Sequence, residues 1–243
     1  MRDSTGPESI VPSAAAAASR SPASPGGSVD AADGARRLIR VDHPLVQHKL
    51  SYLRDKETPT VHFRKLVNEL TLLLTYEATK EFPTEPIEIE TPLERMTAQR
   101  IPGKKVAVCP VLRAGLGMLD GVLSLISGAR VGFIGLYRDE ETLLPVEYYV
   151  KLPADLAERD AIVLDPMLAT GNSSAAAIAS VKAQGARSVI LVCLVAAPEG
   201  IEHLQAEHPD VTIVTAAVDR GLNERGFIVP GLGDAGDRLY GTK

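Results

Sequence analysis

The sequence predicts an α/β fold with a largely parallel central sheet flanked by helices. Strand-like apolar runs alternate with helix-like segments along most of the chain, and this order requires parallel strands joined by right-handed crossovers. The 243 residues suit one catalytic domain, and a hydrophobic content of 45% is sufficient for its core. Ligands of such sheets gather outside the carboxyl ends of the strands, so we examine the loops that follow them.

The first 34 residues differ in kind from the rest. Residues 1–34 are rich in Ala, Ser, Pro and Gly and contain almost no large apolar side chain, which predicts a disordered tail before a domain spanning 35–243. Asp3 and Glu8 are not typical of a secretory signal. A transit function and a misassigned start codon remain open for this segment.

Two helices should open the domain. Asp42 or His43 lies at the cap of the first, and Pro44 occupies the first helical position, where a missing N–H costs nothing. The second should follow Thr60, because apolar residues recur there at spacings of three and four, namely Phe63, Leu66, Val67, Leu70, Leu73 and Leu74. His43, His48 and His62 have no clustered Cys, His or Asp partners, so we interpret them as structural or surface residues.

Further along, strands and helices alternate. The sequence predicts an exposed strand at Ile87–Glu90, a buried strand at Lys105–Val111, a helix near Leu116–Ile126 and a strand at Arg130–Leu136. A charged segment from Tyr137 to Pro145 should form a flap. The later expected strands are Val146–Val150, Ala161–Leu164, Val189–Val195 and Val211–Val218, and the later expected helices are Ala175–Gln184 and Glu199–Glu207.

Composition and charge exclude several classes of partner. A net charge of −5 without a long Lys/Arg run argues against a nucleic-acid-binding surface. No apolar stretch reaches the roughly 18 to 20 residues that span a bilayer, so we expect a soluble protein without membrane contact. Cys109 and Cys193 lie in apolar runs and lack metal-ligand spacing, which predicts reduced core thiols and a cytoplasmic location.

The most informative stretch is the strand-to-helix turn at AIVLDPMLATGNSS. An apolar strand ends at Asp165, and the turn contains Thr170, Gly171, Ser173 and Ser174. Unpaired N–H groups at a helix start bind phosphate, and a carboxylate accepts hydrogen bonds from sugar hydroxyls, so the turn predicts a ribose-phosphate site. Neither a Walker nor a dinucleotide pattern is present. The alternative is an ordinary turn in which the acid caps the helix.

Other strand ends carry basic and glycine-rich loops. Arg113 stands beside two glycines in LRAGLG, Arg138 lies in the charged flap, and the PGLGDAGDR segment is too irregular for a strand and suited to wrapping a flat ring. Two arginines plus a phosphate cradle imply several phosphates. We expect the loops after Val111, Leu136, Leu164 and Val218 to share one crevice. Each arginine alone is also compatible with a solvated surface residue.

Four motifs, LRAGLGM, YRDEET, LDPMLATG and GFIVPGLGDAGDR, occur in this order, and together they resemble the uracil phosphoribosyltransferase family. HPLVQHKL near the start is also similar, and the likeness covers nearly everything from Arg37 to Lys243. The resemblance implies a type I phosphoribosyltransferase fold with a flap hairpin and a C-terminal base-binding segment. It further implies the reaction of uracil with 5-phosphoribosyl 1-diphosphate (PRPP) to give UMP and diphosphate, with Mg²⁺ accompanying PRPP.

The resemblance also assigns residues. Its catalytic positions fall on Arg113, Arg138, Asp165 and Asp234, and its uracil site falls on the main chain of Ile228, Gly233, Asp234 and Ala235. Its PRPP site comprises Arg113, Arg138, Asp165, Pro166, Met167, Leu168, Ala169, Thr170, Gly171, Asn172, Ser173 and Asp234. The protein contributes few Mg²⁺ ligands, because PRPP supplies most of the oxygens, and no covalent intermediate is expected. A homo-oligomer is implied, and GTP activates some relatives.

One departure concerns Asn172, where the family usually has a second glycine; Asn tolerates positive φ, so we expect the turn to survive. Two alternatives stay open. A regulatory protein that senses UMP or PRPP would keep the fold without catalysis, although the retained acid and arginines argue against it. A sister enzyme for orotate or purines would need another base site. Orotate calls for an added cation, for which the base loop offers only Arg238.

Overall fold

The computed structural model describes residues 38–103, 106–138 and 145–242, with the side chains of Arg138 and Pro145 excepted. Its centre is a nine-stranded sheet of order β1-β11-β10-β8-β4-β6-β7, in which β5 also pairs with β4 and β9 with β10. The predicted tail, residues 1–34, and most of the charged flap, residues 139–144, lie outside the described residues. The predicted α/β fold is confirmed.

Every pairing in this sheet is parallel except that between β6 and β7. The described ends of the flap, Arg138 and Pro145, pair across that antiparallel ladder, as a hairpin requires. Continuous apolar runs bury the central strands on both faces, as is typical of parallel sheets. The strands are β1 (Leu38–Arg40), β4 (Val106–Leu112), β5 (Arg130–Val131), β6 (Phe133–Arg138), β7 (Pro145–Lys151), β8 (Asp160–Leu164), β9 (Met167–Leu168), β10 (Ser188–Ala196) and β11 (Thr212–Val218).

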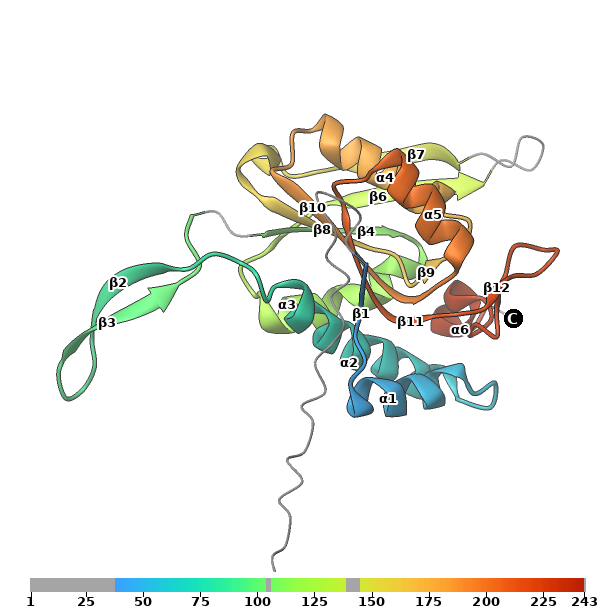
Figure 1. The fold of residues 1–243 in the computed structure, drawn as a ribbon, viewed down its shortest axis with the longest axis horizontal. Helices are drawn as coiled ribbons and strands as arrows, with labels where there is room; N and C mark the ends of the chain where they lie inside the picture. Colours follow the sequence, from blue (N-terminus) through green and yellow to red (C-terminus); the bar gives the residue numbers. More distant parts are fainter. Residues whose placement is uncertain (1–37, 104–105, 139–144, 243) are drawn as a thin grey trace, which may run out of the picture.

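Helices cover both faces of the sheet (Figure 1). One face packs against α1 (Pro44–Arg54), α2 (Thr60–Ala78) and α3 (Leu119–Leu125), and the other against α4 (Asn172–Ala183) and α5 (Pro198–Glu207). Alternate strand residues supply the two cores. In β8, for example, Ile162 and Leu164 join the α2 side, whereas Ala161 and Val163 join the α4 side.

The two N-terminal helices form where the sequence predicts them. His43 caps α1 and accepts a hydrogen bond from Leu45 N–H at 3.1 Å, with Pro44 at the first helical position. In α2 the predicted stripe residues Phe63, Val67, Leu70 and Leu74 are buried, and Leu66 and Leu73 are partly buried against the same core. Burial of this stripe attaches the helix to the sheet.

Several elements differ from the predictions. The helix predicted over 116–126 begins as a 3₁₀ turn at Ala114–Met118, because its glycines hold the chain close to the sheet. A short 3₁₀ turn at Leu156–Glu158 precedes β8. The exposed strand at 87–90 belongs to a hairpin, β2 (Glu85–Glu90) with β3 (Arg95–Arg100), that projects from the body (Figure 1). The sequence did not predict β3, since its residues are almost all exposed and carry no burial pattern.

Candidate active site

Three neighbouring strands bring the predicted donor residues to one edge of the sheet. Arg113 follows β4, Arg138 ends β6, and Asp165 follows β8. Strand β4 lies between β6 and β8; its Pro110 is in register with Leu164 at the end of β8, whereas its last residue, Leu112, is in register with Gly135 inside β6. The three loops therefore follow parallel neighbouring strands, and the crevice that they should share stays a prediction. The described part of Arg138 is its backbone.

Asp165 is half-buried and held by two hydrogen bonds. Its Oδ2 accepts from the Ser174 hydroxyl at 2.9 Å, and its Oδ1 accepts from Met167 N–H at 3.3 Å. Burial raises the pKa of this carboxyl to about 6, and the two hydrogen bonds act in the opposite direction. The sequence grouped Ser174 with the phosphate-binding hydroxyls, but the structure pairs it with Asp165 and buries it.

The phosphate turn begins its helix earlier than predicted. Helix α4 starts at Asn172 rather than at Ala175, and Gly171 is its cap with a φ of 85°. The first hydrogen bond of the helix runs from Ala175 N–H to Gly171 O, so the N–H groups of residues 172–174 lie ahead of it. Asn172 is thus the first helical residue, and the positive φ expected of it belongs to Gly171. The alternative in which Asp165 caps α4 is excluded, because its carboxylate accepts hydrogen bonds from the Ser174 hydroxyl and from Met167 N–H and not from a backbone N–H of the helix.

The rest of the turn is fastened to β10 and α5. Pro166 O accepts hydrogen bonds from Leu194 and Val195 N–H, and β9 places Met167 and Leu168 beside β10. The start of α5 packs directly against the turn, since a Cβ on Gly200 would lie 2.3 Å from Ala169 O. The turn is therefore preorganised, with Thr170 half-buried and Ser173 exposed at its tip.

The Arg113 loop is fixed from two sides. Gly115 approaches β8 so closely that a Cβ there would lie 2.3 Å from Leu164 O. Tyr240 Oη donates to Arg113 O at 2.8 Å, which anchors the loop to the last helix. The Leu112–Arg113 peptide bond is cis. The exposed Arg113 guanidinium makes no hydrogen bond or ion pair within the described residues, so it is available to an anion.

The C-terminal segment has more regular structure than predicted. Strands β12 (Gly221–Leu222) and β13 (Ile228–Val229) pair, the Val229–Pro230 bond is cis, and α6 (Ala235–Tyr240) follows. Asp234 caps α6 by accepting from Asp237 N–H at 2.9 Å. The sequence predicted an irregular segment, but Asp234 caps a short helix there, whose Ala235, Gly236 and Leu239 are buried. Gly236 lies near Ala114, so the segment borders the Arg113 loop.

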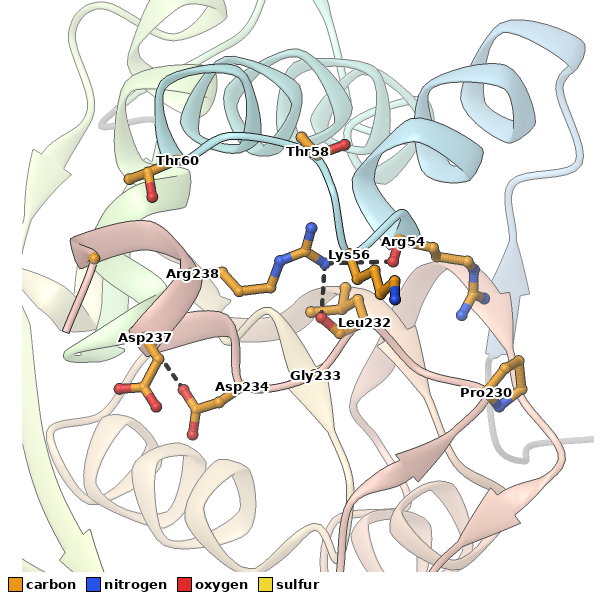
Figure 2. Close-up of a pocket in the computed structure, with 11 residues that line it drawn as sticks. Arg54, Lys56, Thr58, Thr60, Pro230, Leu232, Gly233, Asp234, Asp237 and Arg238 are labelled. Carbon is orange, nitrogen blue, oxygen red and sulfur yellow. Dashed lines mark hydrogen bonds between the residues drawn. The ribbon is translucent and has the colours of Figure 1, made fainter. Parts of the chain in front are cut away.

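A cavity of about 510 Å³ lies between this segment and the loop joining α1 to α2 (Figure 2). Of the predicted site residues it contacts Gly233 and Asp234, whereas Arg113 and the Asp165 turn lie outside it. Its lining residues are Arg54, Lys56, Thr58, Thr60, Pro230, Leu232, Gly233, Asp234, Asp237, Arg238 and Gly241. This cavity therefore does not include the predicted donor residues at the ends of β4 and β8.

Arg238 is not the free cation that an orotate site would need. Its Nη1 donates to Leu53 O at 2.7 Å and to Leu232 O at 2.8 Å, and its Nη2 donates to Asp55 O. The guanidinium also lies over the Phe63 ring, 4.3 Å from its centroid. Backbone carbonyls therefore occupy this arginine, and sequence reasoning had no signal for partners about 180 residues distant.

The described residues contain no group of three or more His, Cys, Asp and Glu side chains placed to hold a metal ion. Both cysteines are fully buried, and burial raises the pKa of each thiol to about 12. Among the described helices none is sufficiently long and apolar to cross a bilayer.

Asp165 and the start of α4 follow β8, the Arg113 loop follows the neighbouring strand β4, and the C-terminal segment borders that loop. This is the arrangement that the type I phosphoribosyltransferase fold predicts. Residues 40–242 match the sequence profile described as uracil phosphoribosyltransferase. The chain belongs to the uracil phosphoribosyltransferase family.

Individual relatives agree with this assignment. The chain is 60% identical over 207 residues to the uracil phosphoribosyltransferases of Bacillus thuringiensis (strain Al Hakam) and Brevibacillus brevis, which covers 85% of this chain and 99% of each relative. Among solved structures, the AQ2163 protein from Aquifex aeolicus superposes with a TM-score of 0.80 at 38% identity, covering 84% of this chain and 97% of that one. The similarity thus extends over the whole described domain.

Proposed function

We propose that the crevice at the ends of β4, β6 and β8 transfers the phosphoribosyl group of PRPP to uracil, giving UMP and diphosphate. The observation that carries the proposal is the meeting of the Asp165 turn, the Arg113 loop and the C-terminal segment at one edge of the sheet. These three elements match the three parts of the reaction: ribose phosphate, diphosphate and base. Family membership supplies the identity of the base.

The donor site comprises Asp165 to Ser173 together with Arg113 and Arg138. The N–H groups at the start of α4 hold the 5-phosphate, because they lack intrahelical partners and lie at the positive end of the helix. Asp165 accepts hydrogen bonds from the ribose hydroxyls, and Ser174 keeps its carboxylate oriented. Arg113 and Arg138 pair with the diphosphate by planar forks.

The chemistry requires no side-chain nucleophile. Diphosphate leaves the anomeric carbon of ribose as the base nitrogen approaches, and the transition state carries positive charge on the ribose. Arg113, Arg138 and the loop N–H groups stabilise the negative charge on the leaving group, so catalysis rests on positioning and preorganised electrostatics. Asp234 is the residue that would lie near a Mg²⁺ ion carried by PRPP, and such an ion would add to this neutralisation.

The base site comprises main-chain groups of Ile228 and of Gly233, Asp234 and Ala235. Uracil presents an N–H between two carbonyl oxygens, whereas cytosine presents an acceptor in place of that N–H. Main-chain groups that pair with the edge of uracil are left partly unpaired when cytosine binds. This mismatch can reduce kcat/KM for cytosine by about 10⁴-fold or more. Because Arg238 is occupied by carbonyls, the PGLGDAGDR loop, all of whose residues are described, offers no spare cation for orotate.

Three properties of the family extend the proposal. A homo-oligomer follows from the resemblance, and sedimentation of the purified chain tests it. GTP activates some relatives, and a GTP titration of the rate tests whether it activates this chain. The cytoplasm is proposed as the location, because two buried free thiols suit a reducing compartment. Fractionation of cells that express the full chain tests the last point.

The test of the reaction is UMP formation from labelled uracil, PRPP and Mg²⁺, beside parallel assays with cytosine, orotate and hypoxanthine. We expect turnover with uracil alone and its loss in Asp165→Asn. Asp210→Asn is the matched control, because Asp210 lies before β11, at the opposite edge of the sheet, and pairs with Lys182. Tight binding of UMP or PRPP without turnover of any base would instead support a regulatory sensor.

A further inference from the structure

Arg54 and Asp219 form an ion pair that involves none of the predicted site residues. Arg54 is the last residue of α1, and Asp219 directly follows β11. The guanidinium donates from Nη1 to Oδ2 at 2.7 Å and from Nη2 to Oδ1 at 2.6 Å, and the Asp219 side chain is only 5% exposed. A bidentate pair of this kind sets direction as well as distance.

Both partners also bind the backbone of Gly231. Asp219 Oδ2 accepts from Gly231 N–H at 2.8 Å, and Arg54 Nη1 donates to Gly231 O at 2.7 Å. Gly231 has a φ of 58°, and a Cβ there would lie 2.1 Å from Ile228 O, so the chain turns sharply at this point. The peptide groups on either side of Gly231 cannot rotate without breaking a charge-assisted hydrogen bond.

The next carbonyl along the chain is held as well, by Arg238. This residue donates to Leu232 O at 2.8 Å. In Figure 2 the Arg238 side chain reaches Leu232, whereas the Arg54 side chain points away from it, on the side of Pro230. The link 230–232, which joins Ile228 to the Gly233–Ala235 stretch, is therefore fixed at Gly231 from the end of α1 and the end of β11, and at Leu232 from α6.

The geometry points to Arg54 and Asp219 as positioning residues for base recognition. They orient Gly231, and through it the main-chain groups of Ile228 and of residues 233–235 that face the base. The inference rests on the proposed location of uracil at those groups. No hydrogen bond joins either side chain to Arg113 or to the Asp165 turn within the described residues. Asp234 is thus the one proposed donor residue that the pair reaches, and the main effect of the pair falls on the base.

The experiment measures KM for uracil and KM for PRPP separately in Asp219→Asn and Arg54→Lys. Misplacement by about 1 Å costs up to about 100-fold in such sites. We expect KM for uracil to rise about 10-fold to 100-fold, KM for PRPP to stay within about threefold, and discrimination against cytosine to fall. Arg54→Lys keeps the charge and loses the fork, so it separates geometry from charge.

Two further variants make the result decisive. Glu69→Gln breaks the partly buried Lys49–Glu69 pair, which also involves α1, and should leave both KM values unchanged. Gly233→Ala perturbs the proposed base site itself, because Gly233 has a φ of 80°. If Gly233→Ala raises KM for uracil and neither pair variant does, the positioning role is wrong while the base site stands.

Other outcomes are equally clear. If Gly233→Ala also leaves KM for uracil unchanged, the base site is misassigned and the positioning role falls with it. A parallel rise of both KM values together with a lower Tm would mean a merely structural ion pair and would overturn the inference. If Asp219→Asn does not fold, KM for uracil and KM for PRPP measured in Arg54→Lys test the inference.

Discussion

The Ser174 hydroxyl donates a hydrogen bond to Asp165 Oδ2 at 2.9 Å, from the first turn of α4 to the end of β8. The same carboxylate is the group that we assign to the ribose hydroxyls, and burial raises its pKa to about 6. A hydrogen bond to the charged form lowers a carboxyl pKa, so Ser174 partly offsets the effect of burial. This pair connects the stability of the fold to the pH range of the reaction.

Removal of Ser174 should move the acid limb of the pH profile. Ribose binding needs the Asp165 carboxylate, so kcat/KM should decline as pH falls through about 6. Ser174→Ala removes a group that lowers this pKa, and the acid limb should shift to higher pH. Ser173→Ala is the control; its exposed hydroxyl should affect KM for PRPP and leave the limb in place. An unshifted limb in Ser174→Ala would contradict this role.

Asp165→Asn should abolish activity and stabilise the fold. The folded pKa of about 6 exceeds the unfolded value of 3.8, so protonation of Asp165 stabilises the folded state. This contribution is complete below pH 3.8 and is lost as pH rises through 6. At neutral pH the ionised group thus costs up to about 3 kcal/mol, which a neutral amide avoids. Thermal unfolding at pH 7.5 should give a higher Tm, by about 2–4 °C per kcal/mol.

The test is whether the Tm of Asp165→Asn lies above or below that of the parent. A lower Tm for Asp165→Asn at neutral pH would mean that the hydrogen bonds outweigh burial. The difference between variant and parent should shrink at pH 5, where the parent's carboxyl is largely protonated. Asp210→Asn offers a comparison, because Lys182 lowers the pKa of that exposed carboxyl and its loss should destabilise slightly.

Gly171→Ala should raise KM for PRPP. Gly171 has a φ of 85°, and its Cβ would lie 2.9 Å from Gly200 O, so a side chain must distort the phosphate turn. Gly185→Ala is matched to it at the other end of the same helix, with a φ of 84° and only ordinary contact with Ala157. Both changes should cost about 1 kcal/mol or more of stability. A similar KM effect from both would contradict a local role for Gly171.

Gly115→Ala should destabilise the fold and impair donor binding. Its Cβ would lie 2.3 Å from Leu164 O, so the Arg113 loop or the end of β8 must move. Overpacking of this kind typically costs about 1–3 kcal/mol. Gly128→Ala, which meets nothing within 4 Å, should be neutral within about 0.5 kcal/mol. Urea unfolding followed by PRPP kinetics measures both effects, and equal stabilities for the two variants would refute the contact.

Local patterns were sufficient for much of the molecule. Apolar runs and the spacing of α2 predicted the core strands and helices, since burial is what makes an element periodic. The sequence predicted the Asp165 turn and the Arg113 loop as ligand-binding loops, because glycines with an acid, a base or hydroxyls at the end of a strand are typical of such loops. Strand β3 and helix α6 were missed, because exposed residues and a capped six-residue turn leave no periodic signal.

The sequence by itself determined the α/β class, the identity of the strand-end loops and, through its motifs, the family. The tertiary structure alone decided which side chains act in pairs. The Ser174 hydroxyl, which the sequence placed in the phosphate turn, bonds to Asp165. Arg238, the candidate cation of the base loop, donates to backbone carbonyls, and Arg54 pairs with Asp219 across 165 positions. Helix and strand periods depend on neighbours in the chain, whereas these partners become neighbours only when the sheet and its two helical layers have assembled.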